Sequence, residues 1–450
     1  MARVFISTLG CPKNAIDSEG LGGLLAAGGH ELSERAEGSD VVLVNTCGFI
    51  DPARRETVEE VLDLAELKES AGLKGLVMTG CLVARSADEL ATALPEVDAL
   101  IDFAAYPRVA EIVGAVAAGT LTDRIQGDPG TRFDPAWWDA SMATAPRVRF
   151  GRAPWAYLKI AEGCDRGCTF CAIPLMRGKF VSRPLDVIFG EARHLAAQGV
   201  SELSLVSQDS VQWGRDIGAG NLVDLLRALE DVDGIRRIRL MYLHPQGVTD
   251  ELIDAIAGSE KVVSYFDLSL QHVAPSVLRG MGRWGSAARF TKMIDRIRSR
   301  DPLAGIRTTF ILGFPGESDA DAGEVESFVA DASVDWIGTF TYSRESGTRS
   351  HDLTAQVPAE VARERAEKVR VAAEAAMERR AGSLVGHSLE VLVERFDLQE
   401  QTWIGRSHRE APEIDGEITF TSPRGLSIGD YVAVNISGHE GTDLAGSIAS

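Results

Sequence analysis

The sequence predicts an α/β protein built from an open parallel α/β sheet domain, a central partial (β/α)6 barrel and a small C-terminal β-barrel. Short apolar runs alternate with amphipathic segments over most of the 450 residues, as is typical of repeated βα units. Beyond residue 383 the pattern changes to short alternating runs with glycine-bearing turns, which indicates strands without helices. A chain of this length also exceeds what one compact core usually organises, so we expect several domains.

Residues 1–118 are expected to form the N-terminal domain. Three runs rich in aliphatic residues are predicted to be buried parallel strands, and two segments with apolar residues at helical spacing are predicted to cover the sheet. These are the strands at 4–8, 41–45 and 76–79 and the helices at 18–27 and 57–70.

Residues 119–152 lose this periodicity, and we expect an irregular connection between domains there. Glycines and prolines punctuate the segment, namely Gly127, Pro129, Gly130, Pro135 and Pro146. Its one unusual feature is the adjacent pair Trp137 and Trp138. We expect these two side chains to anchor the connection on a domain surface rather than to contact substrate.

Residues 153–382 alternate again, and six predicted strands separated by helical segments favour a partial barrel. The strands are expected at 156–160, 202–206, 236–241, 265–270, 306–312 and 336–342. Chemistry in such a barrel belongs at the carboxyl ends of the strands. A polar helix at 360–380 then leads to residues 383–450, where runs at 389–394 and 431–436 predict the small β-barrel.

The composition narrows the class of function. The formal net charge of -20 works against loose binding to nucleic acid, because such affinity comes mainly from lysine and arginine, and it suits a basic partner better. Six cysteines are too few for a disulfide scaffold, and their grouping suits metal ligation in a reducing compartment. No apolar run approaches membrane-spanning length, so we expect a soluble cytoplasmic protein.

The most specific signal is the C-x3-C-x2-C loop formed by Cys164, Cys168 and Cys171, directly after a predicted strand. Three thiolates on one short loop can hold three irons of a [4Fe-4S] cubane, which leaves the fourth iron open to an outside ligand. The alternative is a zinc loop, but zinc sites usually present two separated cysteine pairs. We therefore predict a catalytic iron-sulfur cluster.

The run at 163–174, GCDRGCTFCAIP, resembles the cluster loop of radical S-adenosylmethionine (SAM) enzymes, and Phe170 matches the aromatic residue that this family often has before the third cysteine. The resemblance implies that the open iron binds SAM, whose reductive cleavage gives a 5'-deoxyadenosyl radical. It also implies cofactor contacts on later strands and turns, at Gln208, Gln271, His272, Arg307 and Gly313. Arg307 could bind the cofactor carboxylate. The alternatives stay open that His272 is a hydrogen-bonded barrel histidine and Arg307 part of a surface ion pair.

A second triad is spread along the N-terminal domain. Cys11, Cys47 and Cys81 each follow a predicted strand, and the ends of parallel strands share one edge of the sheet. Three distant thiols could therefore converge there on a second cubane. Taken alone, such cysteines are more often small buried residues.

Three motifs resemble the methylthiotransferase family of radical SAM enzymes, namely LGCPKN at 9–14, DSE at 17–19 and NTC at 45–47. The resemblance implies that Cys11, Cys47 and Cys81 hold a second [4Fe-4S] cluster. It further implies that one SAM donates a methyl group and a second one yields the radical that removes hydrogen from an unactivated carbon. Sulfur is then transferred, and the product is a methylthioether.

Members of this family act on an adenosine of transfer RNA or on an aspartate of small-subunit ribosomal protein S12. The C-terminal barrel resembles a TRAM domain, yet residues 382–450 hold four arginines against eleven acidic residues, a net charge of -7. That charge suits a basic ribosomal protein better than bare transfer RNA. The motifs at 9–14 and 405–416 also resemble the branch that modifies the ribosomal protein.

We therefore expect methylthiolation of an aspartate β-carbon in S12, with a flavodoxin-like or other reductase as electron donor and a separate sulfur donor. Two alternatives remain at this point. One is transfer-RNA methylthiolation, and the other is a non-catalytic iron-sulfur electron-transfer or RNA-binding protein.

Overall fold

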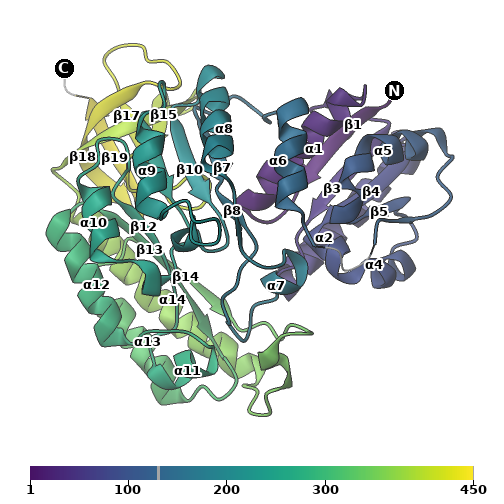
Figure 1. The fold of residues 1–450 in the computed structure, drawn as a ribbon. Coiled ribbons are helices and arrows are strands. Elements are labelled where there is room, and N and C mark those ends of the chain that lie inside the picture. The colour runs from purple at the N-terminus through teal and green to yellow at the C-terminus, as the bar shows by residue number, and fades with distance from the viewer. Residues whose placement is uncertain (129–131, 449–450) are drawn as a thin grey trace.

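The computed structural model describes residues 1–128 and 132–448, so Pro129 and Gly130 of the predicted connection lie outside the described residues. Figure 1 shows an α/β unit at the N-terminus, an arc of strands surrounded by helices in the middle, and a small barrel at the C-terminus. The predicted fold class is confirmed by this arrangement. In the described part of the chain, no helix is long and apolar enough to cross a membrane.

The N-terminal unit is a six-stranded parallel sheet in the order β2-β1-β3-β4-β5-β6. Its strands are β1 (Arg3–Thr8), β2 (Glu31–Ser33), β3 (Val41–Thr46), β4 (Gly75–Gly80), β5 (Ala99–Ile101) and β6 (Ile125–Gln126). Its helices are α1 (Pro12–Ala27), α2 (Asp51–Ala65), α3 (Leu67–Ser70), α4 (Cys81–Ala93) and α5 (Val109–Ala118), with a 3-10 turn η1 (Phe103–Arg108). Apolar side chains of the sheet alternate between two cores, one beneath α1 and α5 and the other beneath α2 and α4.

The connection between the first two units is more regular than its sequence predicts. It contains β6, which extends the sheet, and helix α6 (Pro135–Thr144). The helix has little apolar periodicity, but Asp134 caps its first turn and Pro135 stands at its first position, which are the signals that could have located it. Trp138 is buried over Gly20 of α1, so its predicted anchoring role is confirmed.

The middle unit is a partial barrel of six parallel strands, as predicted. The strands are β7 (Trp155–Lys159), β10 (Glu202–Val206), β11 (Arg237–Leu240), β12 (Tyr265–Gln271), β13 (Gly305–Leu312) and β14 (Trp336–Thr341). They form the ladders β11-β10-β7 and β12-β13-β14, which two isolated bridges between Ile238 and Val262 and between Leu243 and Leu268 connect. β7 and β14 are therefore the two edges of the arc.

Helices cover the outside of the arc and enclose its main apolar core. They are α8 (Leu185–Ala197), α9 (Leu222–Glu230), α10 (Asp250–Ala257), α11 (Pro275–Gly280), α12 (Ala287–Arg300), α13 (Asp319–Asp331) and α14 (Ala359–Gly382). A short hairpin of β8 (Ala161–Glu162) and β9 (Val181–Ser182) follows β7 and encloses the short helix α7 (Ile173–Met176).

The N-terminal unit contacts both edges of this arc. Helix α1 packs on β7, and Glu345, in the segment after β14, accepts bonds from Arg54 of α2 (2.5 Å) and Arg85 of α4 (2.8 Å). The N-terminal unit thereby closes the side that the six strands leave open (Figure 1).

The C-terminal barrel docks at the opposite end from the cysteine loop. Its strands are β15 (Ser388–Asp397), β16 (Thr402–Arg406), β17 (Ile418–Thr421), β18 (Tyr431–Glu440) and β19 (Asp443–Ile448), closed in the order β15-β16-β17-β19-β18. Arg406 binds Glu202 at the start of β10 (3.1 Å), and Arg409 binds Asp335 just before β14 (2.6 Å). These residues lie at the amino ends of the barrel strands. The small barrel therefore covers that end of the partial barrel, which we call the barrel floor.

Candidate active site

The first cysteine triad lies on the loop between β8 and α7, at the carboxyl end of the barrel. The Cys164 N–H donates to the Gly178 carbonyl (3.1 Å), which ties the start of the loop to the β8–β9 hairpin. Gly163 makes this turn possible, because it has φ +74 and an added Cβ would meet the Lys179 carbonyl oxygen at 2.0 Å. These backbone contacts fix the start of the loop.

Burial raises the pKa of the Cys164 thiol to about 11 and that of Cys171 to about 12. Cys168 adds to the rise at both cysteines, and Cys164 adds to the rise at Cys171. Two donors reach these sulfur atoms: the backbone N–H of Arg166 donates to Cys164 Sγ (3.4 Å), and Arg283 Nη1 donates to Cys168 Sγ (3.5 Å). Cluster ligands must be thiolates, so iron binding at Cys164 and Cys171 must release their protons.

The second triad forms where three parallel strands end, as predicted. Cys11 caps α1 after β1, Cys47 follows β3, and Cys81 is the first residue of α4 after β4. Gly10 has φ +94, and a Cβ there would lie 2.7 Å from Cys47 Cβ, so only glycine lets these two loops approach. Burial raises the pKa of Cys47 to about 11, with added contributions from Cys11 and Cys81.

Among residues 1–128 and 132–448, no group of three His, Cys, Asp or Glu side chains is gathered closely enough to hold one metal ion.

A buried arginine, Arg177, links the chain segment after the first triad to a cysteine of the second. Arg177 lies six residues beyond Cys171, and its Nε donates to Cys81 Sγ of the other triad (3.2 Å). Its two terminal nitrogens donate to Asn14 (2.8 Å) and Asp17 (2.7 Å) of α1. The side chain is fully enclosed, and although burial alone lowers its pKa, the surrounding anionic groups hold it well above the usual value. Sequence reasoning missed this residue.

Lys159 and Glu162 complete the same network on the barrel side. Lys159 Nζ binds Asp17 (2.5 Å) and Glu162 (2.7 Å), and Glu162 also accepts from Arg177 (3.3 Å) and Gln208 (2.5 Å). Burial alone would raise the pKa of Glu162, but Lys159 and Arg177 hold it well below its usual value. The one sequence signal was a charged residue, Lys159, inside an otherwise apolar predicted strand.

Gln208 and Asp209 follow β10 next to the first triad. Asp209 accepts from Arg166 of the cysteine loop (2.6 Å), and Gln208 donates to Glu162. In the described part of the chain, Gln208 Oε1 and Asp209 Oδ1 are buried without a hydrogen-bond partner. Two free acceptors in a buried position fit a polar ligand that donates hydrogen bonds.

Of the other predicted cofactor residues, Phe170 and Gln271 are partly buried, whereas His272 is fully buried. Phe170 packs on an apolar cluster with Phe314, and Gln271 has φ +71 and donates weakly to Thr309 on β13 (3.4 Å). The His272 ring is held by its neighbours: its Nδ1 accepts from the Ala274 N–H (3.0 Å) and its Nε2 lies 3.5 Å from Glu317. These contacts agree with the alternative interpretation, in which His272 is a hydrogen-bonded barrel histidine.

Gly313 and Arg307 lie on or beside β13. Glu317 accepts from the Gly313 N–H (2.8 Å), and a Cβ on Gly313 would meet the Ala362 side chain of α14 at 2.3 Å. Arg307 is the third residue of β13 rather than its end, and it lies 3.9 Å from Asp267 and 3.7 Å from Asp415 of the small barrel. Both ion pairs are largely buried, so Arg307 does not form the surface ion pair that was the alternative interpretation.

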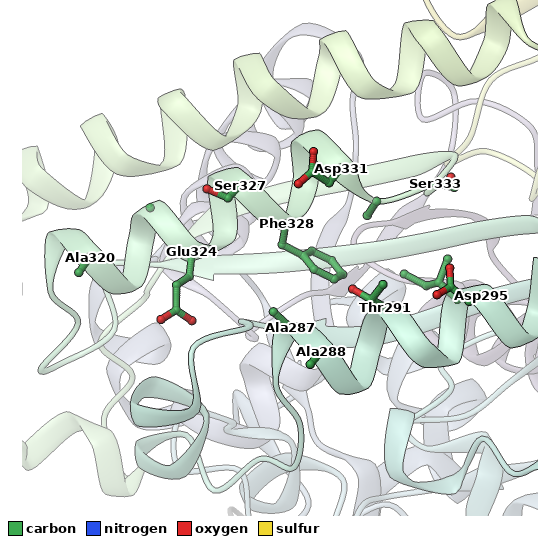
Figure 2. A pocket seen from close by; sticks show the side chains of 13 residues that line it. Ala287, Ala288, Thr291, Asp295, Ala320, Glu324, Ser327, Phe328, Asp331 and Ser333 are labelled. Atoms are coloured by element: carbon green, nitrogen blue, oxygen red, sulfur yellow. The ribbon is translucent and has the colours of Figure 1, made fainter.

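A separate groove of about 620 Å³ lies between α12 and α13 (Figure 2). It is lined by small and polar side chains with Phe328 at its base, and none of the six cysteines lines it. Its acidic residues Asp295, Glu324 and Asp331 are on the outer face of the barrel. We place no chemistry there.

Three family models match the chain. The model described as "Uncharacterized protein family UPF0004" matches residues 3–102, the Radical SAM superfamily matches 158–329, and the TRAM domain matches 385–449. Proteins named "Ribosomal protein uS12 methylthiotransferase RimO" match over almost the whole length. That of Symbiobacterium thermophilum is 42% identical (99% of this chain, 90% of the relative), and that of Geobacter sulfurreducens is 38% identical (100% and 99%). The chain belongs to the RimO family of radical SAM methylthiotransferases.

The fold agrees with that membership. Among solved structures, the radical SAM methyltransferase TsrM from Kitasatospora setae with cobalamin and a [4Fe-4S] cluster is similar at a TM-score of 0.53 and 16% identity, over 87% of this chain and 81% of TsrM. At this identity the likeness concerns the fold alone. As a RimO-family radical SAM enzyme, the protein uses SAM and [4Fe-4S] chemistry, and the thiol triads with their nearby arginine donors fit such clusters.

Proposed function

We propose that this protein uses two [4Fe-4S] clusters to add a methylthio group to the β-carbon of an aspartate in ribosomal protein uS12. The observation that carries the proposal is the pair of cysteine triads, one on the barrel loop and one on the N-terminal sheet, joined through Arg177. The RimO relatives are named for uS12, which supports the substrate. A single radical cluster would leave the second triad without a role.

The six cysteines have the roles of cluster ligands in this proposal. Cys164, Cys168 and Cys171 would hold the cluster that binds SAM, and Cys11, Cys47 and Cys81 would hold the auxiliary cluster. When bound, these groups supply the electrons, the radical chemistry and the sulfur that the reaction needs. The chain itself holds the two triads at a fixed separation, because Arg177 and Lys159 bridge the two units through buried bonds.

The residues around the first triad would orient SAM. The unpartnered oxygens of Gln208 and Asp209 could accept from its ammonium group, and Phe170 and Gln271 would line the same space. His272 and Gly313 would act indirectly, by holding the turn after β13 against Glu317. The ion pairs of Arg307 with Asp267 and Asp415 favour a role in the barrel floor over a contact with the cofactor carboxylate.

The C-terminal barrel favours a protein substrate over transfer RNA. Of its four arginines, Arg406 and Arg409 are buried and paired with carboxylates, so they cannot reach phosphates. Arg395 also has a carboxylate partner, Glu417. What remains on the surface is mostly acidic, which attracts a basic ribosomal protein and repels a phosphate backbone.

The proposal extends to the cellular setting and the division of the chain. Because the substrate belongs to the ribosome, we assign the enzyme to the cytoplasm, with a flavodoxin-like or other reductase as electron donor and a separate sulfur donor. We assign residues 1–118 to the auxiliary-cluster domain, 119–152 to the connection, 153–382 to the radical SAM core and 383–450 to the small barrel.

Mass spectrometry of uS12 tests the proposal. The anaerobically reconstituted enzyme is incubated with uS12, SAM, sulfide and a strong reductant, and a parallel reaction contains transfer RNA instead. A methylthio mass increment on one aspartate of uS12 is the expected result. Cleavage of SAM with modified transfer RNA and unmodified uS12 would assign the enzyme to the other substrate, and no reductive cleavage would leave only a non-catalytic role.

A further inference from the structure

Among the described residues, Lys13 is a buried cation that no carboxylate bonds. It is the second residue of α1, two positions after Cys11, and its side chain is only 7% exposed. Within residues 1–128 and 132–448, no carboxylate oxygen lies within 4.0 Å of its ammonium. The other buried lysine of this part of the chain, Lys159, has two such partners, Asp17 and Glu162. A buried charge is normally paired, and beside Cys11 and Tyr242 this ammonium has no bonded carboxylate among the described residues, so its position fits a carboxylate that arrives from outside.

The barrel holds this ammonium from the opposite side. Lys13 Nζ lies 3.4 Å from the centroid of the Tyr242 ring, in the segment that follows β11. Tyr242 has φ +59, a conformation that a bulky residue adopts only when its surroundings enforce it, and its backbone N–H donates to Asp267 (2.9 Å). The Tyr242 side chain fixes the lysine, but this one partner cannot satisfy all three N–H donors of the ammonium.

The position matters for the reaction. Lys13 stands next to Cys11 of the auxiliary triad, and Tyr242 belongs to the barrel that carries the other triad, so the ammonium lies where the two units meet. The proposed substrate is an aspartate whose reacting β-carbon is bonded directly to its carboxylate. A cation that binds this carboxylate would present the neighbouring carbon between the triads. An adenosine base has no such anionic group.

We propose that Lys13 binds the side-chain carboxylate of the target aspartate and so selects an acidic residue as substrate. This inference rests on the proposed function. Lys13 is a positioning and specificity residue here, and the contact requires the charge of its side chain rather than its length alone.

The test compares two substrates with four enzymes. The substrates are uS12 with its modified aspartate and the same protein with Asn at that position, and the enzymes are wild type, Lys13→Met, Lys13→Arg and the control Lys292→Met on the exposed face of α12. We measure the affinity of each pair, kcat/KM for methylthiolation, and iron content with the cluster spectrum. Wild type should favour the Asp substrate by roughly thirtyfold or more in kcat/KM, since one member of a buried charge pair is lost with Asn.

Lys13→Met should reduce this preference to within about threefold while it retains iron, cluster spectrum and SAM cleavage, and Lys13→Arg should restore part of the preference. Lys292→Met should match wild type. If wild type modifies uS12 and Lys13→Met keeps the full preference, the role of Lys13 is refuted and the proposed function stands. Loss of iron or an altered cluster spectrum in Lys13→Met would refute it as well, because the lysine would then serve the cluster. If wild type does not modify uS12, both proposals fall.

Discussion

The two cysteine triads reach their sites by different routes. Cys164, Cys168 and Cys171 lie within eight residues on one loop, whereas Cys11, Cys47 and Cys81 span 71 residues and meet only because β1, β3 and β4 are neighbours in a parallel sheet. The first site is therefore encoded locally and the second by the topology. The local site depends on its loop and the hairpin beside it, while the dispersed site depends on the register of three strands.

The largest expected effect separates the two triads by function. Cys168→Ala should abolish reductive cleavage of SAM, because the radical cluster loses a ligand. Cys47→Ala should spare cleavage and stop methylthiolation, because only the auxiliary cluster is affected. Quantifying 5'-deoxyadenosine and methylthiolated uS12 in the same reactions checks both. If both variants are folded and lose cleavage equally, the two triads do not have separate roles.

Substitution of the glycine beside each triad, Gly10 or Gly163, should disrupt that triad and leave the other intact. Gly10→Ala places a Cβ 2.7 Å from Cys47 Cβ, and Gly163→Ala places one 2.0 Å from the Lys179 carbonyl. We expect each reconstituted variant to lose about four irons, from the auxiliary cluster in the first and from the radical cluster in the second. Iron analysis with electron paramagnetic resonance distinguishes them. Gly29→Ala, at φ +83 with open space around it, is the matched control and should keep full iron content.

The buried hydrogen bonds of Arg177 should contribute measurably to the free energy of unfolding. Arg177→Met removes the donor that Cys81, Asn14 and Asp17 share, and it leaves buried carboxylates with fewer partners. We expect a loss of about 3–5 kcal/mol in the free energy of unfolding, measured by urea denaturation of the metal-free protein. The exposed Arg193→Met on α8 should change it by less than about 0.5 kcal/mol. Equal stability of the two variants would mean that the network does not hold the units together.

Much of both triads could be predicted from the sequence, but what joins them could not. A cysteine at the end of an apolar run is visible in the chain, and parallel topology brings such ends together. The bonds of Arg177 and Lys159 to Asp17 link residues 160 and 142 positions apart, and they exist only after two separately folded units dock. The same reason explains Arg307, whose partner Asp415 comes from the small barrel, and helix α6 was missed because it lacks an apolar stripe.

A smaller effect concerns the floor of the barrel, far from either triad. Burial alone raises the pKa values of Glu202 and Asp335, but the arginines around them lower both to about 2. Because these folded-state values lie below the ordinary ones, the stabilisation is complete above about pH 4.5 and is lost as the pH falls toward 2. In thermal melts of the metal-free protein, these two groups should leave the melting temperature unchanged from pH 5 to 7 and lower it below pH 4.5. A rise in stability on acidification would contradict the assignment.

Iron counting in two triple variants tests the central claim most directly. One variant replaces Cys11, Cys47 and Cys81 with Ala, and the other replaces Cys164, Cys168 and Cys171. Mössbauer spectra after anaerobic reconstitution should show about eight irons in wild type and about four in each variant, all as [4Fe-4S] clusters. If removing one triad empties both sites, or leaves the iron content unchanged, the two triads do not hold two separate clusters.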